Sequence, residues 1–165
     1  RDIPSFGELM DYRIRLMQKH NISFSSLKKV AEQMTPLDGA REFLDRVRQD
    51  FQVVILSDTF YELAMPLMSK LGDPLLLCHR LQIEGDMISG YRLRAEKAKK
   101  QAVEAFNGMG YSCIAVGDSY NDIQMFEVSE KAYFINAPQV ITDAYPAISS
   151  VQSYSELLEE LKNLQ

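Results

Sequence analysis

The sequence predicts an α/β protein with a doubly wound, mostly parallel sheet. From residue 35 onward, segments with apolar residues at helical spacing alternate with short, continuous apolar runs at residues 51–56, 75–78 and 113–116. Such runs between helices are typical of strands that are buried on both faces of a parallel sheet. A chain of 165 residues, 46% hydrophobic and 25% charged, is long enough for one core of this kind.

The N-terminal part predicts a separate helical unit. Apolar residues recur at helical spacing between residues 6 and 34, around a break near Asn21. We therefore expect two short antiparallel helices that form a small cap at residues 1–35, and an α/β core at residues 36–165.

Within the core, each of the three apolar runs follows a predicted helix, at residues 37–49, 61–71 and 97–106. Residues 82–88 alternate between polar and apolar around Gly85, which predicts a β-hairpin flap. Further strands are expected at residues 132–135 and 148–151, with a helical turn from Pro138 between them and a last helix after Ser153.

Charge and composition exclude several classes of partner. Eighteen Lys and Arg against twenty-three Asp and Glu give a net charge of −5, the wrong sign for binding nucleic acid or an anionic membrane. No apolar run approaches the ~20 residues of a membrane span. The two cysteines, Cys78 and Cys113, lie in apolar runs, which favours core packing and a reducing cytoplasm.

Polar residues come directly after two of the predicted strands. Ser57, Asp58 and Thr59 come after the first run, and Asp118, Asn121 and Asp122 come after Gly117 at the end of the third. Ligands of such sheets lie at the carboxyl ends of the strands. Two carboxylates there repel each other by about 4 kcal/mol at 4 Å, and a divalent cation such as Mg²⁺ relieves this. The alternatives are a solvated loop for the aspartates and a helix cap for Asn121.

Basic residues gather at the start of a predicted helix: Arg94, Lys97, Lys99 and Lys100. Cations there oppose the helix dipole, so one of them is expected to meet an anion. Lys99 lies one helix and one strand before Asp118 and can return to the same edge of the sheet. Lys97 and Lys100 are interpreted as solvated. His20 and His79 are too few and too far apart for a zinc site, and we interpret them as a solvated and a strand-end residue.

A hydroxyl after one strand, a lysine before another and the GDSYND sequence together resemble three of four signature motifs of the haloacid dehalogenase (HAD) superfamily, which has a Rossmann-like fold. Residues 34–40, 51–59 and 118–122 resemble its phosphoserine phosphatase branch, and LSDTFYE is closer still to the phosphoserine phosphatase/homoserine phosphotransferases. The resemblance spans nearly the whole chain.

The resemblance implies a Mg²⁺-dependent phosphatase that acts on phosphoserine, with homoserine as a second acceptor besides water. It implies that Ser57 and Lys99 contact the phosphoryl group, Asp118 binds Mg²⁺, Asn121 and Asp58 contact substrate, and Asp122 orients Lys99 or metal-bound water. In the cap, Phe6 and Arg13 match an aromatic residue and an arginine of the amino-acid pocket. From this sequence alone Arg13 is a surface charge.

One family motif is absent. The DxD or DxE sequence of the first strand, which holds the nucleophilic aspartate, does not occur between Arg1 and Gln165. We expect the nucleophile and its central strand, about 30 residues with a helix and loops, to lie before Arg1. The chain as printed is then inactive, with a gap in the sheet between the strands that end at Leu56 and Val116. The alternatives are a HAD phosphatase for another small phosphate ester and a non-catalytic module that binds anions or a protein.

Overall fold

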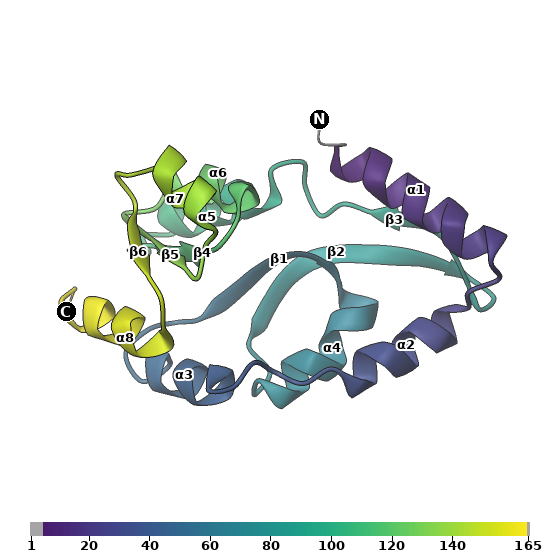
Figure 1. Cartoon of the computed structure of the whole chain (residues 1–165), viewed down its shortest axis with the longest axis horizontal. Helices are drawn as coiled ribbons and strands as arrows, with labels where there is room; N and C mark the ends of the chain where they lie inside the picture. Colours follow the sequence, from purple (N-terminus) through teal and green to yellow (C-terminus); the bar gives the residue numbers. More distant parts are fainter. Residues whose placement is uncertain (1–4, 165) are drawn as a thin grey trace.

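The computed structural model describes residues 5–164, and the strands among them form two sheets of three (Figure 1). The first has the order β1 (Val54–Phe60), β2 (Leu75–Glu84), β3 (Met87–Arg92), and the second has β4 (Ile114–Gly117), β5 (Lys131–Ile135), β6 (Ser149–Val151). All neighbouring strands are parallel except β2 and β3, which form the predicted antiparallel hairpin. The α/β class with a mostly parallel arrangement is confirmed.

The sheet is interrupted between β1 and β4, which do not pair with each other in the described chain. This agrees with the expected gap between the strands that end at Leu56 and Val116. Leu56 nevertheless packs against the core cluster that includes Ala115 of β4. The residues of β1 before Phe60 are only half-buried, although the sequence predicts a strand buried on both faces. Full burial is found instead at Tyr133 and Phe134 of β5, both 0% exposed.

The helices occur at the predicted places, with ends that differ by a few residues. They are α1 (Phe6–Lys19), α2 (Phe24–Gln33), α3 (Ala40–Val47), α4 (Tyr61–Lys70), α5 (Ala98–Gly108), α6 (Ile123–Phe126), α7 (Gln139–Ala144) and α8 (Tyr154–Lys162), with a 3₁₀ turn, η1 (Tyr120–Asp122). Figure 1 shows α5, α6 and α7 around the second sheet, and α8 beside α3. None of the described helices is long and apolar enough to cross a membrane.

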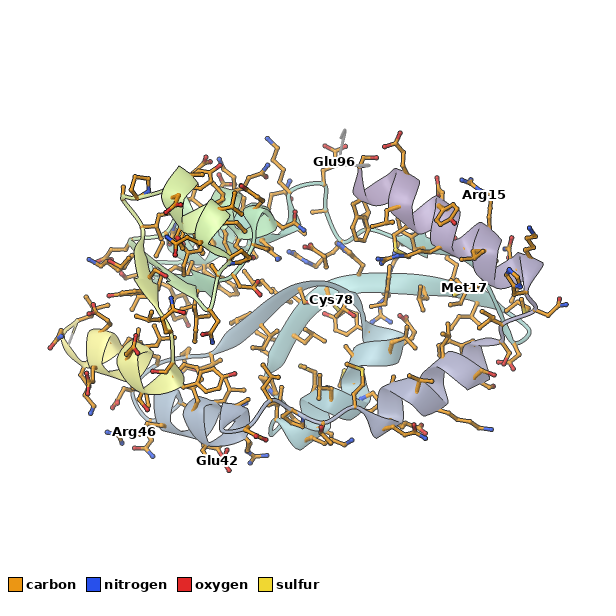
Figure 2. All side chains as sticks on the ribbon, viewed as in Figure 1. Arg15, Met17, Glu42, Arg46, Cys78 and Glu96 are labelled. Atoms are coloured by element: carbon orange, nitrogen blue, oxygen red, sulfur yellow. The ribbon has the colours of Figure 1, made fainter. Side chains whose placement is uncertain are left out.

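The two N-terminal helices lie against the hairpin. Ser5 and Glu8 form a capping box at the start of α1, and Asn21, with φ 50°, marks the predicted break. Met10 and Ile14 of α1 pack against Ile88 of β3, so this helix covers the flap (Figure 1). In Figure 2, Met17 points from α1 toward the interior and Arg15 points away from it. The proposed cap boundary at residue 35 falls between α2 and α3.

Strand β1 does not end at Leu56, as the sequence predicts, but continues to Phe60. Leu56 pairs with Leu77 and Phe60 with His79, so β1 advances four residues while β2 advances two. The extra residues form a bulge that contains Ser57, Asp58 and Thr59. Bulges change the direction of side chains next to functional sites. The polar cluster is therefore part of an irregular strand and not of a loop after it.

Candidate active site

Lys99 connects the two sheets at their carboxyl ends. Its ammonium group lies 2.8 Å from Oδ1 of Asp122, after β4, and 3.2 Å from Oδ2 of Asp58, in the β1 bulge. Only 14% of the Lys99 side chain is exposed. Burial opposes its charge, but the hydrogen bonds to Asp122 and Asp58 and the charges of both carboxylates outweigh burial and raise the pKa of Lys99. The ammonium group is therefore held charged between two strand ends. Lys100 lies outside this group and pairs with Glu127 at 3.6 Å.

Asp122 is the best-supported side chain of the site. Its Oδ2 accepts hydrogen bonds from the backbone amides of Asp118 and Ser119, both at 3.0 Å, and from the Ser119 hydroxyl at 2.9 Å. Its Oδ1 accepts from Lys99. The Asp122 carboxylate is buried, and both of its oxygens accept hydrogen bonds from the protein. Asp122 is thus arranged to orient Lys99 and the turn after β4.

Gly117 makes this arrangement possible. A Cβ atom built at Gly117 would lie 2.4 Å from the carboxyl carbon of Asp122, closer than packed atoms can approach. A residue with a side chain at this position would force the Asp122 carboxylate away. The glycine that the sequence analysis assigned to a tight turn is therefore required for close approach of Asp122.

Asp118 and Asn121 are both exposed at the mouth of β4. Mg²⁺ commonly binds to one or two carboxylates and takes its remaining ligands from water and phosphate. The exposed Asp118 carboxylate fits that kind of site. No three His, Cys, Asp or Glu side chains among residues 5–164 gather closely enough to enclose a metal. Among the described residues, Asp118 is thus an exposed carboxylate directly after β4, and no protein cage for a metal is present.

Ser57 has its hydroxyl proton available for an anion. Its Oγ accepts a hydrogen bond from the backbone amide of Thr59 at 3.3 Å, which leaves the O–H free to donate. This bond closes the bulge that carries Asp58. Of the residues predicted at the ends of β1 and β4, Asp58 and Asp122 face one another across Lys99.

His79 belongs to this group, which corrects its interpretation as a plain strand-end residue. It is buried, at 3% exposed, and its Nε2 lies 3.8 Å from Oδ1 of Asp58. The sequence analysis looked for functional residues directly after the apolar runs that end at Leu56 and Val116, because ligands lie at the carboxyl ends of parallel strands. The run that ends at Cys78 is followed directly by His79, so the same criterion could have identified it. Figure 2 places the preceding residue, Cys78, in the middle of β2.

The two cap residues are placed differently. Phe6 begins α1, and its ring meets the His79 ring edge-on with 5.4 Å between centroids. Arg13 is exposed and has no ion pair among the residues that the structure describes. Seven residues separate Phe6 and Arg13, so both point to nearly the same side of α1. The structure brings the Phe6 ring to His79, whereas the Arg13 side chain is exposed.

The fold and strand-end cluster can now be compared with known proteins. A sequence model of the haloacid dehalogenase-like hydrolases matches residues 15–129. The chain is 43% identical over 161 residues to phosphoserine phosphatase ThrH of Pseudomonas aeruginosa, across 97% of this chain and 78% of that protein. It is also 43% identical to a phosphoserine phosphatase of Pseudomonas syringae pv. tomato, of which it covers 68%. A crystal structure of phosphoserine phosphatase from T. onnurineus superimposes with a TM-score of 0.76 at 25% identity, over 99% of this chain and 76% of that one.

This protein belongs to the haloacid dehalogenase-like hydrolase family, because the family's sequence pattern covers most of the chain and the fold agrees. Within the family it lies in the phosphoserine phosphatase branch, where both the sequence relatives and the structural neighbour fall. The resemblance inferred from the motifs is confirmed at both levels. So is the predicted enzyme class, a phosphohydrolase of this family.

Proposed function

We propose that the strand-end cluster of this protein binds the phosphate of phosphoserine, as the intact enzyme's phosphatase site. The observation that carries the proposal is the Lys99 ammonium group, which lies between the ends of β1 and β4, is held by Asp58 and Asp122, and belongs to a side chain only 14% exposed. A fixed, partly desolvated cation at this point can stabilise charge that develops on a transferring phosphoryl group. The relatives named phosphoserine phosphatase support phosphoserine as the substrate.

The roles of the other residues follow from their placement. Ser57 donates its free hydroxyl proton to a phosphoryl oxygen. Asn121, exposed beside Asp118, offers an amide to the phosphate or the amino acid. Phe6 closes the apolar side of the site against His79, and Arg13 grips the substrate carboxylate once the cap closes. In this division, residues 1–35 form the cap and residues 36–165 the core.

Mg²⁺ is the proposed cofactor, held by Asp118. The two carboxylates of Asp58 and Asp122 already outnumber the Lys99 ammonium group that they contact, and a phosphoryl group adds about two more negative charges. A divalent cation at Asp118 offsets that excess and polarises the phosphoryl oxygens. The other residues bind and orient the substrate without it.

The remaining expectations are part of the same proposal. Homoserine serves as a second acceptor of the phosphoryl group, as the LSDTFYE sequence suggests. The nucleophilic aspartate lies before Arg1, so the 165-residue chain binds phosphoserine without turning it over. A reducing, cytoplasmic location is supported by two free thiols, Cys78 and Cys113.

Calorimetric titration of the 165-residue chain with phosphoserine tests the binding proposal. We expect Mg²⁺ to tighten binding in the wild type and to have no effect in Asp118→Asn. Asp38→Asn, a matched change at an exposed position far along the chain, is the control and should keep the Mg²⁺ response. Binding that is equal with and without Mg²⁺ in the wild type would refute the metal role of Asp118. No phosphoserine binding at all would refute the proposed function.

Turnover is tested separately with the protein translated from the complete gene. This protein should release phosphate from phosphoserine with Mg²⁺, and phosphohomoserine should form when homoserine is added. The 165-residue chain, assayed beside it, should release none. Equal turnover by the two would show that the nucleophile is among residues 1–165.

A further inference from the structure

His79 occupies the point at which β2 changes its partner. Up to His79 the strand pairs with β1, and from Arg80 it pairs with β3. Strand β3 returns to the same point, because the backbone amide of Arg94 donates a hydrogen bond to Nδ1 of His79 at 3.1 Å. The imidazole thus sits where the core sheet, the outgoing flap and the returning flap meet.

The other ring nitrogen faces the strand-end cluster. Since Nδ1 accepts a hydrogen bond, the neutral ring carries its proton on Nε2. Nε2 lies 3.8 Å from Oδ1 of Asp58, while the second oxygen of Asp58 contacts Lys99. Asp58 lies in the β1 bulge, where regular strand pairing does not fix side-chain direction. This distance is longer than a hydrogen bond, so His79 faces Asp58 from the β2 side as a donor that a small rotation of either side chain would bring into hydrogen-bond range.

The imidazole ring also contacts the cap. The Phe6 ring of α1 packs edge-on against it with 5.4 Å between ring centroids, and the Phe60 ring at the end of β1 packs against it with 6.2 Å between centroids. A shift of α1 or of the flap would therefore move His79, and through it Asp58. Burial keeps the ring neutral by lowering the pKa of His79, and Asp58 opposes this while Arg94 and Lys99 add to it.

We infer that His79 is a positioning residue, which fixes Asp58 against Lys99 and couples the placement of the cap and flap to that ion pair. The inference rests on the proposed function only in taking Asp58 and Lys99 as part of the phosphate site. A histidine that merely fills the core would need its ring volume and not its two nitrogens. The two cases are separated by exchanging the nitrogens and the volume independently.

The contact itself is tested by nitrogen NMR of the His79 side chain in the 165-residue chain. We expect the tautomer with the proton on Nε2, and a shift of that nitrogen in Asp58→Asn. Glu62→Gln, which alters a neighbouring carboxylate that accepts from the Leu81 amide, is the control and should leave Nε2 unchanged. A proton on Nδ1, or an Nε2 signal that ignores Asp58→Asn, would overturn the inference. This measurement needs no substrate.

The consequence for binding is tested by a double-mutant cycle with phosphoserine as the probe. His79→Phe keeps the ring and loses both nitrogens, and we expect about tenfold weaker binding. His79→Gln carries an amide nitrogen about as far from the backbone as Nε2 and can donate toward Asp58, so it should stay within about threefold of the wild type. In the Asp58→Asn background, His79→Phe should weaken phosphoserine binding by less than about twofold, because the effect of His79 on binding passes through Asp58.

The outcomes separate this inference from the proposed function. Tenfold losses in both backgrounds would mean that His79 does not act through Asp58, and equal losses in His79→Gln and His79→Phe would mean that the Nε2 donor does not matter. Either result overturns the inference. If the wild type binds no phosphoserine, the proposed function fails and the NMR result alone decides the role of His79. If His79→Phe does not fold, His79→Gln and the NMR comparison decide it.

Discussion

At the scale of single residues, the site depends on side chains whose charge is set by burial and by their partners. Lys99 is held charged by two carboxylates, and His79 is held neutral by burial beside the same Asp58. The Asp58 carboxylate thus contacts a cation at 3.2 Å and faces a neutral imidazole at 3.8 Å. Such networks give strong orientation because each member limits the freedom of the next.

The neutral His79 predicts a pH dependence of stability. Burial lowers the pKa of His79 below the ordinary value of about 6.5. Just below pH 6.5, His79 is therefore protonated in the unfolded chain but still neutral in the folded protein. The free energy of unfolding should fall as the pH drops from about 6.5 toward the pKa of the folded state. Urea unfolding at pH 7 and pH 5 should show this loss in the wild type and much less of it in His79→Asn.

The exposed His20 provides the control for this measurement. His20→Asn should lose stability with falling pH as the wild type does. Hydrogen bonds with Ser5 and Arg41 lower the pKa of Glu8 and of Asp45, respectively. The stability that these two carboxylates contribute is therefore lost only below about pH 4.5, outside the range of this measurement. A wild-type slope between pH 7 and 5 that His79→Asn leaves intact would rule out His79 as its source.

At the scale of elements, local irregularities place the functional groups. The bulge in β1 presents Ser57 and Asp58, and the glycine at the end of β4 lets Asp122 fold back onto the turn. Each strand departs from regular geometry at the point where the chemistry is located. Regular strands would direct these side chains alternately to the two faces.

Gly117 gives a test at this scale. Gly117→Ala should lower the free energy of unfolding by about 1–3 kcal/mol and weaken phosphoserine binding, because the new methyl group overlaps the Asp122 carboxylate. Gly108→Ala is the matched control: it lies in α5 with nothing within 4 Å of the added atom and should be neutral or raise stability by up to about 1 kcal/mol. Urea denaturation of both variants measures the difference. Equal effects would contradict the role of close approach.

At the scale of the whole molecule, two sheets without a shared strand pairing are joined at the site. Lys99 of α5 links Asp58 of one sheet to Asp122 after the other, and Leu56 adds an apolar contact between them. The cap helices extend the assembly by packing on the flap. The residues of the candidate site therefore also hold the two sheets together.

The prediction at this scale concerns the loss of the Lys99 contacts between the two sheets. Lys99→Met leaves two carboxylates facing each other without a cation, so we expect a loss of about 3 kcal/mol in stability and of phosphoserine binding. Lys100→Met removes a single partly exposed pair with Glu127 and should cost less than about 1 kcal/mol. Chemical denaturation and calorimetry compare the two neighbours directly. A larger effect at Lys100 would reassign the phosphate lysine.

The sequence by itself determined the α/β class, the cap helices, the flap and the set of strand-end residues. These follow from hydrophobic periodicity and from turn and cap residues, which act over a few neighbouring positions. They predicted Asp118 and Asp122 after β4, where the structure has them, but placed Ser57 after β1, whereas it lies within that strand.

Only the tertiary structure decided how those residues are joined. The β1 bulge depends on register against β2, and the place of His79 depends on the strand at which β2 changes partners. The Lys99 bridge depends on the packing of α5 across both sheets. These relations connect positions far apart in the chain, and their energies come from burial and distance, which local sequence patterns do not contain.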